Sequence, residues 1–194
     1  MSVEKVNNKR TQLIDTALQL FYKQGIHAIG INEILATSGI AKKTLYNHFA
    51  SKEALIQACV IERDKRFMAW FELQCSHANS ATEFIEKLFD GLDDWINNRA
   101  LKIGYFNGCF FVNTAAEYGE TESEIYQLCM QHKLNIKLCI EQQLGLVVNN
   151  AKALKDLTDL LLLLKEGIIN CAYVMNDKQA ALKAKPLALA FNRI

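Results

Sequence analysis

One short segment carries basic, hydroxyl and amide side chains on the expected outward face of a helix. Residues 42–48 read KKTLYNH, and apolar Leu45 and Phe49 are spaced to face inward. Ammonium, hydroxyl and amide groups are those that contact phosphate oxygens and base edges of nucleic acids. We therefore expect a nucleic-acid contact surface made of Lys42, Lys43, Thr44, Tyr46, Asn47, His48 and, in the first turn of the next helix, Lys52.

A second group of residues indicates a sensor. Residues 106–113 read FNGCFFVN, which places Cys109 in the first turn of a helix predicted over 109–118. The positive end of a helix dipole favours thiol reactivity, so Cys109 is a candidate redox or electrophile sensor. Trp95, Phe106 and Phe110 are candidates to line an effector pocket. The alternative is that Cys109 is a small buried residue that packs against the aromatic rings.

Other chemistry has little support in the sequence. Cys129 and His132 share a helical face, but only Cys75 and His77 offer another close pair, whereas structural zinc takes four ligands. The chain has no phosphate-binding glycine loop, no HExxH and no GxSxG motif. We expect no metal, no cofactor and no enzymatic activity. The alternative is an all-helical ligand carrier or an enzyme that uses Cys109.

Helical periodicity dominates the chain and predicts the elements that position these residues. A first helix over about 9–24 ends at Gly25. Two short helices, about 32–37 and 42–48, are separated by a tight turn with Gly39, which describes a helix-turn-helix. A longer helix opens at Ser51, a good N-cap, and continues to about Cys75.

The rest of the chain is also predicted to be helical. Helices are expected over about 80–100, over 109–118, from a T-x-x-E capping box at Thr121 to about Gly145, and over 152–175 and 180–191. The helix at 152–175 is apolar nearly all round and must be covered on every side. We therefore expect a homodimer that forms through about residues 152–191, with a monomer core as the alternative.

The segment Gly25–Leu55 resembles the tetracycline-repressor (TetR) family. The resemblance is carried by the end of the first helix and the turn after it, and by the segments that follow. These are Leu20, Phe21 and Gly25, the GIxxI run at Gly30–Ile34, the Ser38–Lys42 turn, the TLYxxF signature at Thr44–Phe49 and SKEAL at Ser51–Leu55. The resemblance implies an all-α protein with an N-terminal three-helix helix-turn-helix DNA-binding domain, residues 1–55. Residues 56–194 would form a C-terminal helical effector-binding and dimerisation domain.

The resemblance also implies roles for single residues. Thr44, Tyr46 and Lys52 would bind phosphates, and Lys43, Asn47 and His48 would read bases. The GCxxxN run from Gly108 to Asn113 is similar to that of members that sense electrophiles through a cysteine. The implied function is a dimeric repressor that binds a palindromic double-stranded DNA operator and is released by a small-molecule or thiol-reactive effector. Many members carry a serine where Ala41 stands, so this chain lacks that cap.

Composition and charge agree with this interpretation. The 194-residue chain is 51% hydrophobic with a net charge of +1, which excludes intrinsic disorder. Residues 1–66 hold ten of the 22 Lys/Arg and six of the 21 Asp/Glu, so the first part is basic and the rest is acidic. The longest aliphatic run, residues 160–164, is far short of a membrane span of roughly 20 residues. With no secretory signal in the sequence, we expect a cytoplasmic protein with no membrane contact.

Overall fold

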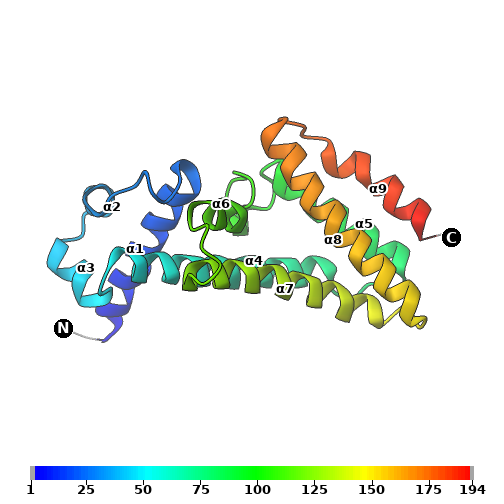
Figure 1. Ribbon diagram of the computed structural model, residues 1–194, viewed down its shortest axis with the longest axis horizontal. Helices are drawn as coiled ribbons and strands as arrows, with labels where there is room; N and C mark the ends of the chain where they lie inside the picture. The colour runs from blue at the N-terminus through cyan, green and yellow to red at the C-terminus, as the bar shows by residue number, and fades with distance from the viewer. Residues whose placement is uncertain (1–2, 193–194) are drawn as a thin grey trace. The chain divides into compact units, whose positions relative to one another are not determined.

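The computed structural model describes residues 3–192, and over that range its secondary structure is helical throughout, with no strand (Figure 1). The chain forms two compact units. Unit 1 comprises the described part of Met1–Lys65 together with Phe110–Gln131, and unit 2 comprises Arg66–Cys109 and the described part of His132–Ile194. The predicted all-α class, with an N-terminal helix-turn-helix and a C-terminal helical part, is confirmed. The division of function at residue 55 stays a prediction.

Three helices of unit 1 make up the head: α1 (Val3–Gln24), α2 (Ile31–Ser38) and α3 (Lys42–His48). Glycines with positive φ end the first two, Gly25 at +89° and Gly39 at +66°. Few other residues tolerate this left-handed backbone, so the glycines fix where the chain turns. The helices enclose an apolar core of Leu13, Ala17, Phe21, Ile26, Ile34, Leu45 and Phe49. The sequence therefore predicts the head closely.

Three further helices contribute residues to unit 1. These are α4 (Lys52–Cys75), α6 (Phe110–Glu117) and α7 (Glu124–Gly145), and the division between the units falls within α4 and α7. The expected cap on α4 is present, because the Ser51 hydroxyl accepts a hydrogen bond from the Ala54 N–H at 3.1 Å. The expected capping box at Thr121 is wrong, since α7 begins three residues later at Glu124.

Unit 2 is built around α5 (Ala81–Ile96), α8 (Ala151–Val174) and α9 (Ala180–Phe191), with a short 3₁₀ helix η1 (Leu101–Ile103). In Figure 1, α8 and α9 run side by side. Side-chain caps open α5 and α8, where the Ser80 hydroxyl accepts from Glu83 N–H and the Asn150 side-chain oxygen accepts from Ala153 N–H. The core of unit 2 is rich in aromatic residues from α4 and α5, including Phe67, Phe71, Phe84, Phe89 and Trp95.

Within the described residues, no helix combines the length and the apolar character needed to cross a lipid bilayer. Here too, no three His, Cys, Asp or Glu side chains gather closely enough to hold a metal ion. The six cysteines all lie within the described residues, and none of them forms a disulfide bond.

Candidate nucleic-acid interface and sensor cluster

The second helix of the helix-turn-helix presents a polar face to solvent. Leu45 is fully buried and Phe49 nearly so, which turns the opposite side of α3 outward. Lys42, Lys43, Tyr46 and Asn47 are exposed, while Thr44 and His48 are half-buried. The structure therefore gathers six of the seven predicted contact residues on α3, with no acidic residue in its first turn.

Lys52 has a local partner of its own. Its ammonium group donates to the Ile26 carbonyl oxygen at 2.9 Å and lies 6.0 Å from the centre of the Phe21 ring. A lysine ammonium has three donors, so this contact leaves donors that can reach a phosphate. Its predicted phosphate contact stays a prediction.

The structure adds a cation that sequence reasoning missed. The exposed guanidinium of Arg10, on α1, lies 5.2 Å from the centre of the Phe49 ring, directly after the end of α3. Arg10 is remote from α3 in sequence, and only the packing of α1 brings it there. A stacked arginine at the end of α3 is a further candidate phosphate contact.

The helices of the interface begin without side-chain caps. Within the described residues, no side chain accepts a hydrogen bond from the first turn of α2 or of α3, whose N-cap positions are Gly30 and Ala41. The predicted absence of a hydroxyl cap at Ala41 is therefore visible in the structure. Glu33 N–H and Thr44 N–H donate to the carbonyl oxygens of Gly30 and Ala41, so the first turns are closed by backbone contacts alone.

In unit 2, the loop before Cys109 is held tightly in place. Gly108 has φ +76°, and a Cβ added there would lie 2.8 Å from the ring of Tyr173 on α8. The Phe106 N–H donates to the Asn98 side-chain oxygen at 2.8 Å, and its ring meets that of Trp95 edge-on at 5.0 Å. The structure thus brings together Trp95 and Phe106, two of the predicted effector residues.

Phe110, the third predicted aromatic, lies in unit 1, where it packs against Tyr22 with ring centres 5.9 Å apart. Cys109 itself is half-buried and directly precedes α6, which begins one position after the expected start. The expected place of Cys109 in the first turn of this helix is therefore wrong. The aromatic side chains expected to line a pocket, Trp95 and Phe106, are instead buried against neighbouring rings.

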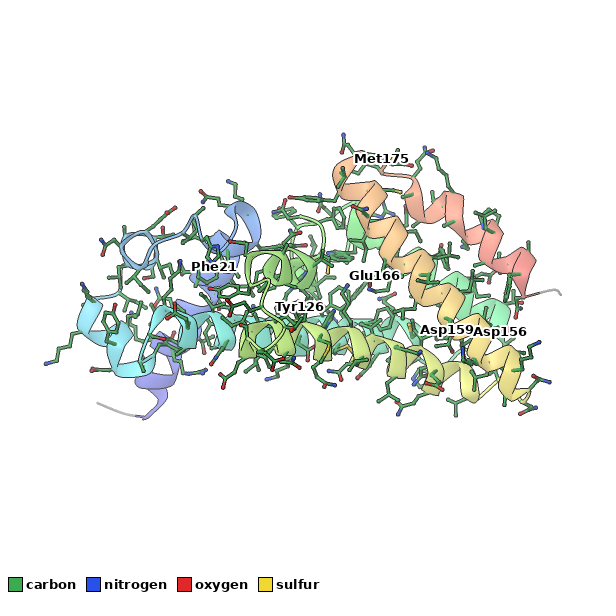
Figure 2. The ribbon with its side chains drawn as sticks, viewed as in Figure 1. Phe21, Tyr126, Asp156, Asp159, Glu166 and Met175 are labelled. Atoms are coloured by element: carbon green, nitrogen blue, oxygen red, sulfur yellow. The ribbon has the colours of Figure 1, made fainter. Side chains whose placement is uncertain are left out.

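Cys109 belongs to a cluster of charged groups, here called the Cys109 cluster: Cys109, Lys133, Lys165 and Glu166. The Lys133 ammonium lies 3.3 Å from the Cys109 sulfur and 2.6 Å from one Glu166 carboxylate oxygen. The other carboxylate oxygen accepts from the ammonium of Lys165 at 2.9 Å. Glu166 is labelled on α8 in Figure 2. Sequence reasoning missed both lysines and the glutamate, because only the packing of α7 and α8 brings them to Cys109.

The cluster has strong electrostatics. Burial alone would raise the pKa of Glu166, but the ammonium groups of Lys165 and Lys133 hold that pKa at about 2. Lys165 has a side chain only 1% exposed, and burial lowers its pKa, against the opposing effect of Glu166. Burial would also lower the pKa of Lys133, yet Cys109 and Glu166 raise it overall. One carboxylate is therefore shared by two lysines.

The other thiols differ from Cys109 in their surroundings. Burial raises the pKa of Cys75 and brings that of Cys139 to about 11, so these two thiols are poor nucleophiles. Cys59 and Cys129 are buried, and Cys171 is half-buried. Cys109 combines partial exposure with an adjacent ammonium group, which is the setting of reactive thiols.

A pocket of about 390 Å³ lies elsewhere in unit 2, where α8 begins and α9 ends. Its lining includes Val148, Leu157 and Phe191. The predicted effector residues Trp95, Phe106, Phe110 and Cys109 are not part of this lining.

Known proteins resemble this chain in two ways. Residues 13–59 match the family described as bacterial regulatory proteins, tetR family. The chain is 30% identical over 94 residues to the HTH-type transcriptional regulator UidR of Escherichia coli K12, which covers 48% of each protein. It is 26% identical over 124 residues to the HTH-type transcriptional repressor KstR2 of Mycobacterium tuberculosis H37Rv, covering 63% of this chain and 52% of that protein. The aligned segments thus span about half the length of these relatives.

Similarity of fold extends much further along the chain. SCO4454, a TetR-family transcriptional regulator from Streptomyces coelicolor, superposes with a TM-score of 0.80 at 24% identity. The superposition covers 95% of this chain and 94% of that one. The shared fold therefore includes both the helix-turn-helix and the helices that follow it.

Proposed function

We propose that this chain, which belongs to the TetR family of bacterial transcriptional regulators, binds double-stranded DNA sequence-specifically and represses transcription from the site it occupies. The observation that carries the proposal is the polar outward face of α3, set on a buried helix-turn-helix core. A helix of this kind fits the major groove of B-DNA. The repressor role is supported by the name of the relative KstR2. Such a protein would act in the cytoplasm, on chromosomal DNA.

Two classes of contact are proposed on α3 and in the first turn of α4. Thr44, Tyr46 and Lys52 bind phosphates, while Lys43, Asn47 and His48 contact base edges; Lys42 adds positive charge. Phosphate contacts raise affinity for every sequence and make it depend on salt, whereas base contacts discriminate between sequences.

Fluorescence anisotropy with the DNA upstream of the gene, in excess unrelated DNA, tests the proposal. We expect tight, salt-dependent binding that survives the competitor. Tyr46→Phe should weaken binding to all sequences alike, and Asn47→Ala should relax the preference at one base pair by about 1–3 kcal/mol. Lys102→Ala, an exposed lysine in unit 2, is the control. Binding abolished by competitor, or an unaltered base preference in Asn47→Ala, would contradict the assignment.

We also propose a homodimer that forms through α8 and α9. Positions 156, 160, 163, 167, 170 and 174 of α8 are exposed or half-exposed and recur at steps of four and three residues, the spacing of a helix–helix seam. Leu163 is 70% exposed, Val174 73% and, on α9, Leu187 64%. A Cβ added at Gly167 would meet nothing within 4 Å, so a helix of a second copy has room there. Two-fold symmetry then suits a palindromic operator.

The effector is proposed to act at Cys109. Its partial exposure and the Lys133 ammonium 3.3 Å from its sulfur favour reaction with a thiol-reactive compound or oxidant. Modification displaces Lys133 and disturbs the Cys109 cluster. Release from DNA then requires that the modified protein favours a separation of its two recognition helices that does not fit the operator. In this scheme α4, which follows each head directly, sets that separation.

N-ethylmaleimide in the same anisotropy assay tests the sensor. We expect the reagent to release the wild-type protein from DNA, and Cys109→Ser to bind DNA normally but to resist release. Cys171→Ser removes the other half-buried thiol and is the matched control, with release unchanged. Release that persists in Cys109→Ser would place the sensor elsewhere or make the effector non-covalent.

A further inference from the structure

We infer that Glu117 is a positioning residue for DNA binding: its carboxylate fixes the turn between α1 and α2 and so makes the affinity of the head depend on α6. The inference rests on the proposed function, since it concerns how the head is held for DNA. It is carried by contacts that lie entirely within unit 1.

The Glu117 carboxylate binds two consecutive backbone amides of the head. One of its oxygens accepts from the Ile26 N–H at 2.8 Å, and the other accepts from the His27 N–H at 2.6 Å. These N–H groups follow directly after the end of α1. Hydrogen bonds to an ionised carboxylate are about twice as strong as neutral ones, so this is a firm attachment of α6 to the head.

The local backbone is shaped for this contact. Gly25 has φ +89°, and a Cβ added there would lie 3.2 Å from the nearer Glu117 oxygen. A side chain at position 25 would therefore strain the backbone and press on the carboxylate. The glycine serves both the end of α1 and the approach of Glu117.

A second element holds the same turn. The Lys52 ammonium donates to the Ile26 carbonyl oxygen at 2.9 Å, so Ile26 is held through its N–H by α6 and through its C=O by α4. The Ile26 side chain is 1% exposed and belongs to the head core. A shift of this turn therefore disturbs the packing beneath α2 and α3.

The position of Glu117 on α6 connects the turn of the head to the segment that contains Cys109. Glu117 is the last residue of α6, and the first, Phe110, directly follows Cys109 in the chain. An eight-residue helix is about 12 Å long, so the two ends of α6 are connected by a short run of hydrogen-bonded backbone. A displacement at its beginning is thus delivered to the turn that Glu117 holds. Sequence reasoning did not select Glu117 or the Ile26–His27 turn, because the two are about 90 positions apart.

The experiment compares Glu117→Gln with Glu120→Gln, an exposed carboxylate three residues further on. Three quantities are measured: amide hydrogen exchange at Ile26 and His27 by NMR, operator affinity by anisotropy, and the thermal unfolding midpoint. Glutamine keeps the size of the side chain and one acceptor oxygen but loses the charge and the second acceptor.

For Glu117→Gln we expect amide exchange at Ile26 and His27 to become about tenfold faster and operator affinity to fall by about tenfold. Both changes correspond to the loss of one charge-assisted hydrogen bond. The unfolding midpoint should stay within a few degrees, and Glu120→Gln should match the wild type. In the wild-type protein, N-ethylmaleimide should also quicken exchange at Ile26 and His27, and Cys109→Ser should abolish that effect.

Several outcomes would overturn the inference. Unchanged exchange in Glu117→Gln would show that the Glu117 carboxylate does not protect the two N–H groups. Faster exchange with undiminished operator affinity would show that the contact stabilises the turn without affecting DNA binding. Should Glu117→Gln fail to fold, Glu117→Asp takes its place, because it keeps the charge but withdraws the carboxylate from the two N–H groups by one methylene, with the same expected shifts. If the wild-type protein itself does not bind DNA, the proposed function fails, while the exchange data still report on the contact.

Discussion

Glu166 is the residue on which the charge balance of unit 2 depends. It neutralises the fully buried Lys165 and also binds Lys133, which in turn contacts Cys109. A buried ammonium without a carboxylate partner is strongly destabilising. Glu166 therefore connects the stability of the core to the group proposed as the sensor.

Replacing Glu166 with glutamine should destabilise the protein in a pH-dependent way. The pKa of Glu166 in the folded protein, about 2, lies below its ordinary value of 4.5. The ionised carboxylate thus stabilises the fold above about pH 4.5, and that contribution is lost as the pH falls towards 2. Urea unfolding of wild type and Glu166→Gln should differ most at pH 7 and converge in acid. Glu122→Gln, an exposed carboxylate, is the control; a difference that stays constant with pH would contradict the assignment.

At the scale of helices, the head differs from unit 2 in how its helices are capped. α5 and α8 begin with side-chain caps, whereas α2 and α3 do not. Caps stabilise a helix by satisfying its first-turn N–H groups, so α3 is held mainly by the burial of Leu45 and Phe49.

A serine at position 41 should stabilise α3. Ala41 has φ −66° and ψ 143°, an extended conformation suited to an N-cap. We expect Ala41→Ser to increase the free energy of unfolding by about 0.5–1 kcal/mol in urea titrations. Ala36→Ser makes the same chemical change at an exposed position inside α2 and should cost a few tenths of a kcal/mol instead. Equal effects of the two substitutions would exclude a capping contribution.

Sequence periodicity predicted the helices well where a glycine or a cap marks an end. α2 and α3 begin and end within a residue or so of their predicted bounds. Gly39 fixes the end of α2, and the buried Ile34 and Leu45 fix which face of each helix is turned inward. The capping box predicted at Thr121 was wrong, because a T-x-x-E pattern is local and does not show that residues 121–122 still form a turn. The Cys109 cluster and the Glu117 contact depend on packing between distant segments, which periodicity does not encode.

At the scale of the molecule, the proposed dimer determines whether the two heads can act together. α8 and α9 leave large aliphatic side chains in solvent when the chain is alone. Large apolar side chains left in solvent on adjacent helices are typical of association sites and support the proposed dimer. Helices α8 and α9 lie in unit 2, whereas the proposed DNA contacts lie in unit 1.

A charge placed on this surface should separate the subunits. Leu163→Glu introduces a carboxylate at a position 70% exposed in the single chain, so it should leave the fold intact and yield monomers in analytical ultracentrifugation. Leu146→Glu, at a leucine 76% exposed outside α8 and α9, should remain dimeric. Palindromic DNA should then be bound far more weakly by Leu163→Glu alone. A dimer that survives Leu163→Glu would place the interface elsewhere.

The close packing of Gly108 against Tyr173 has an evolutionary consequence. A Cβ at position 108 would lie 2.8 Å from the ring, so a side chain there requires the ring to move or to be replaced by a smaller side chain. Relatives that share this arrangement should vary at the two positions together: those that gain a side chain at 108 should carry a smaller residue at 173. Covariation of positions 108 and 173 in related sequences would then identify the members that share the loop before Cys109, without purification of any protein.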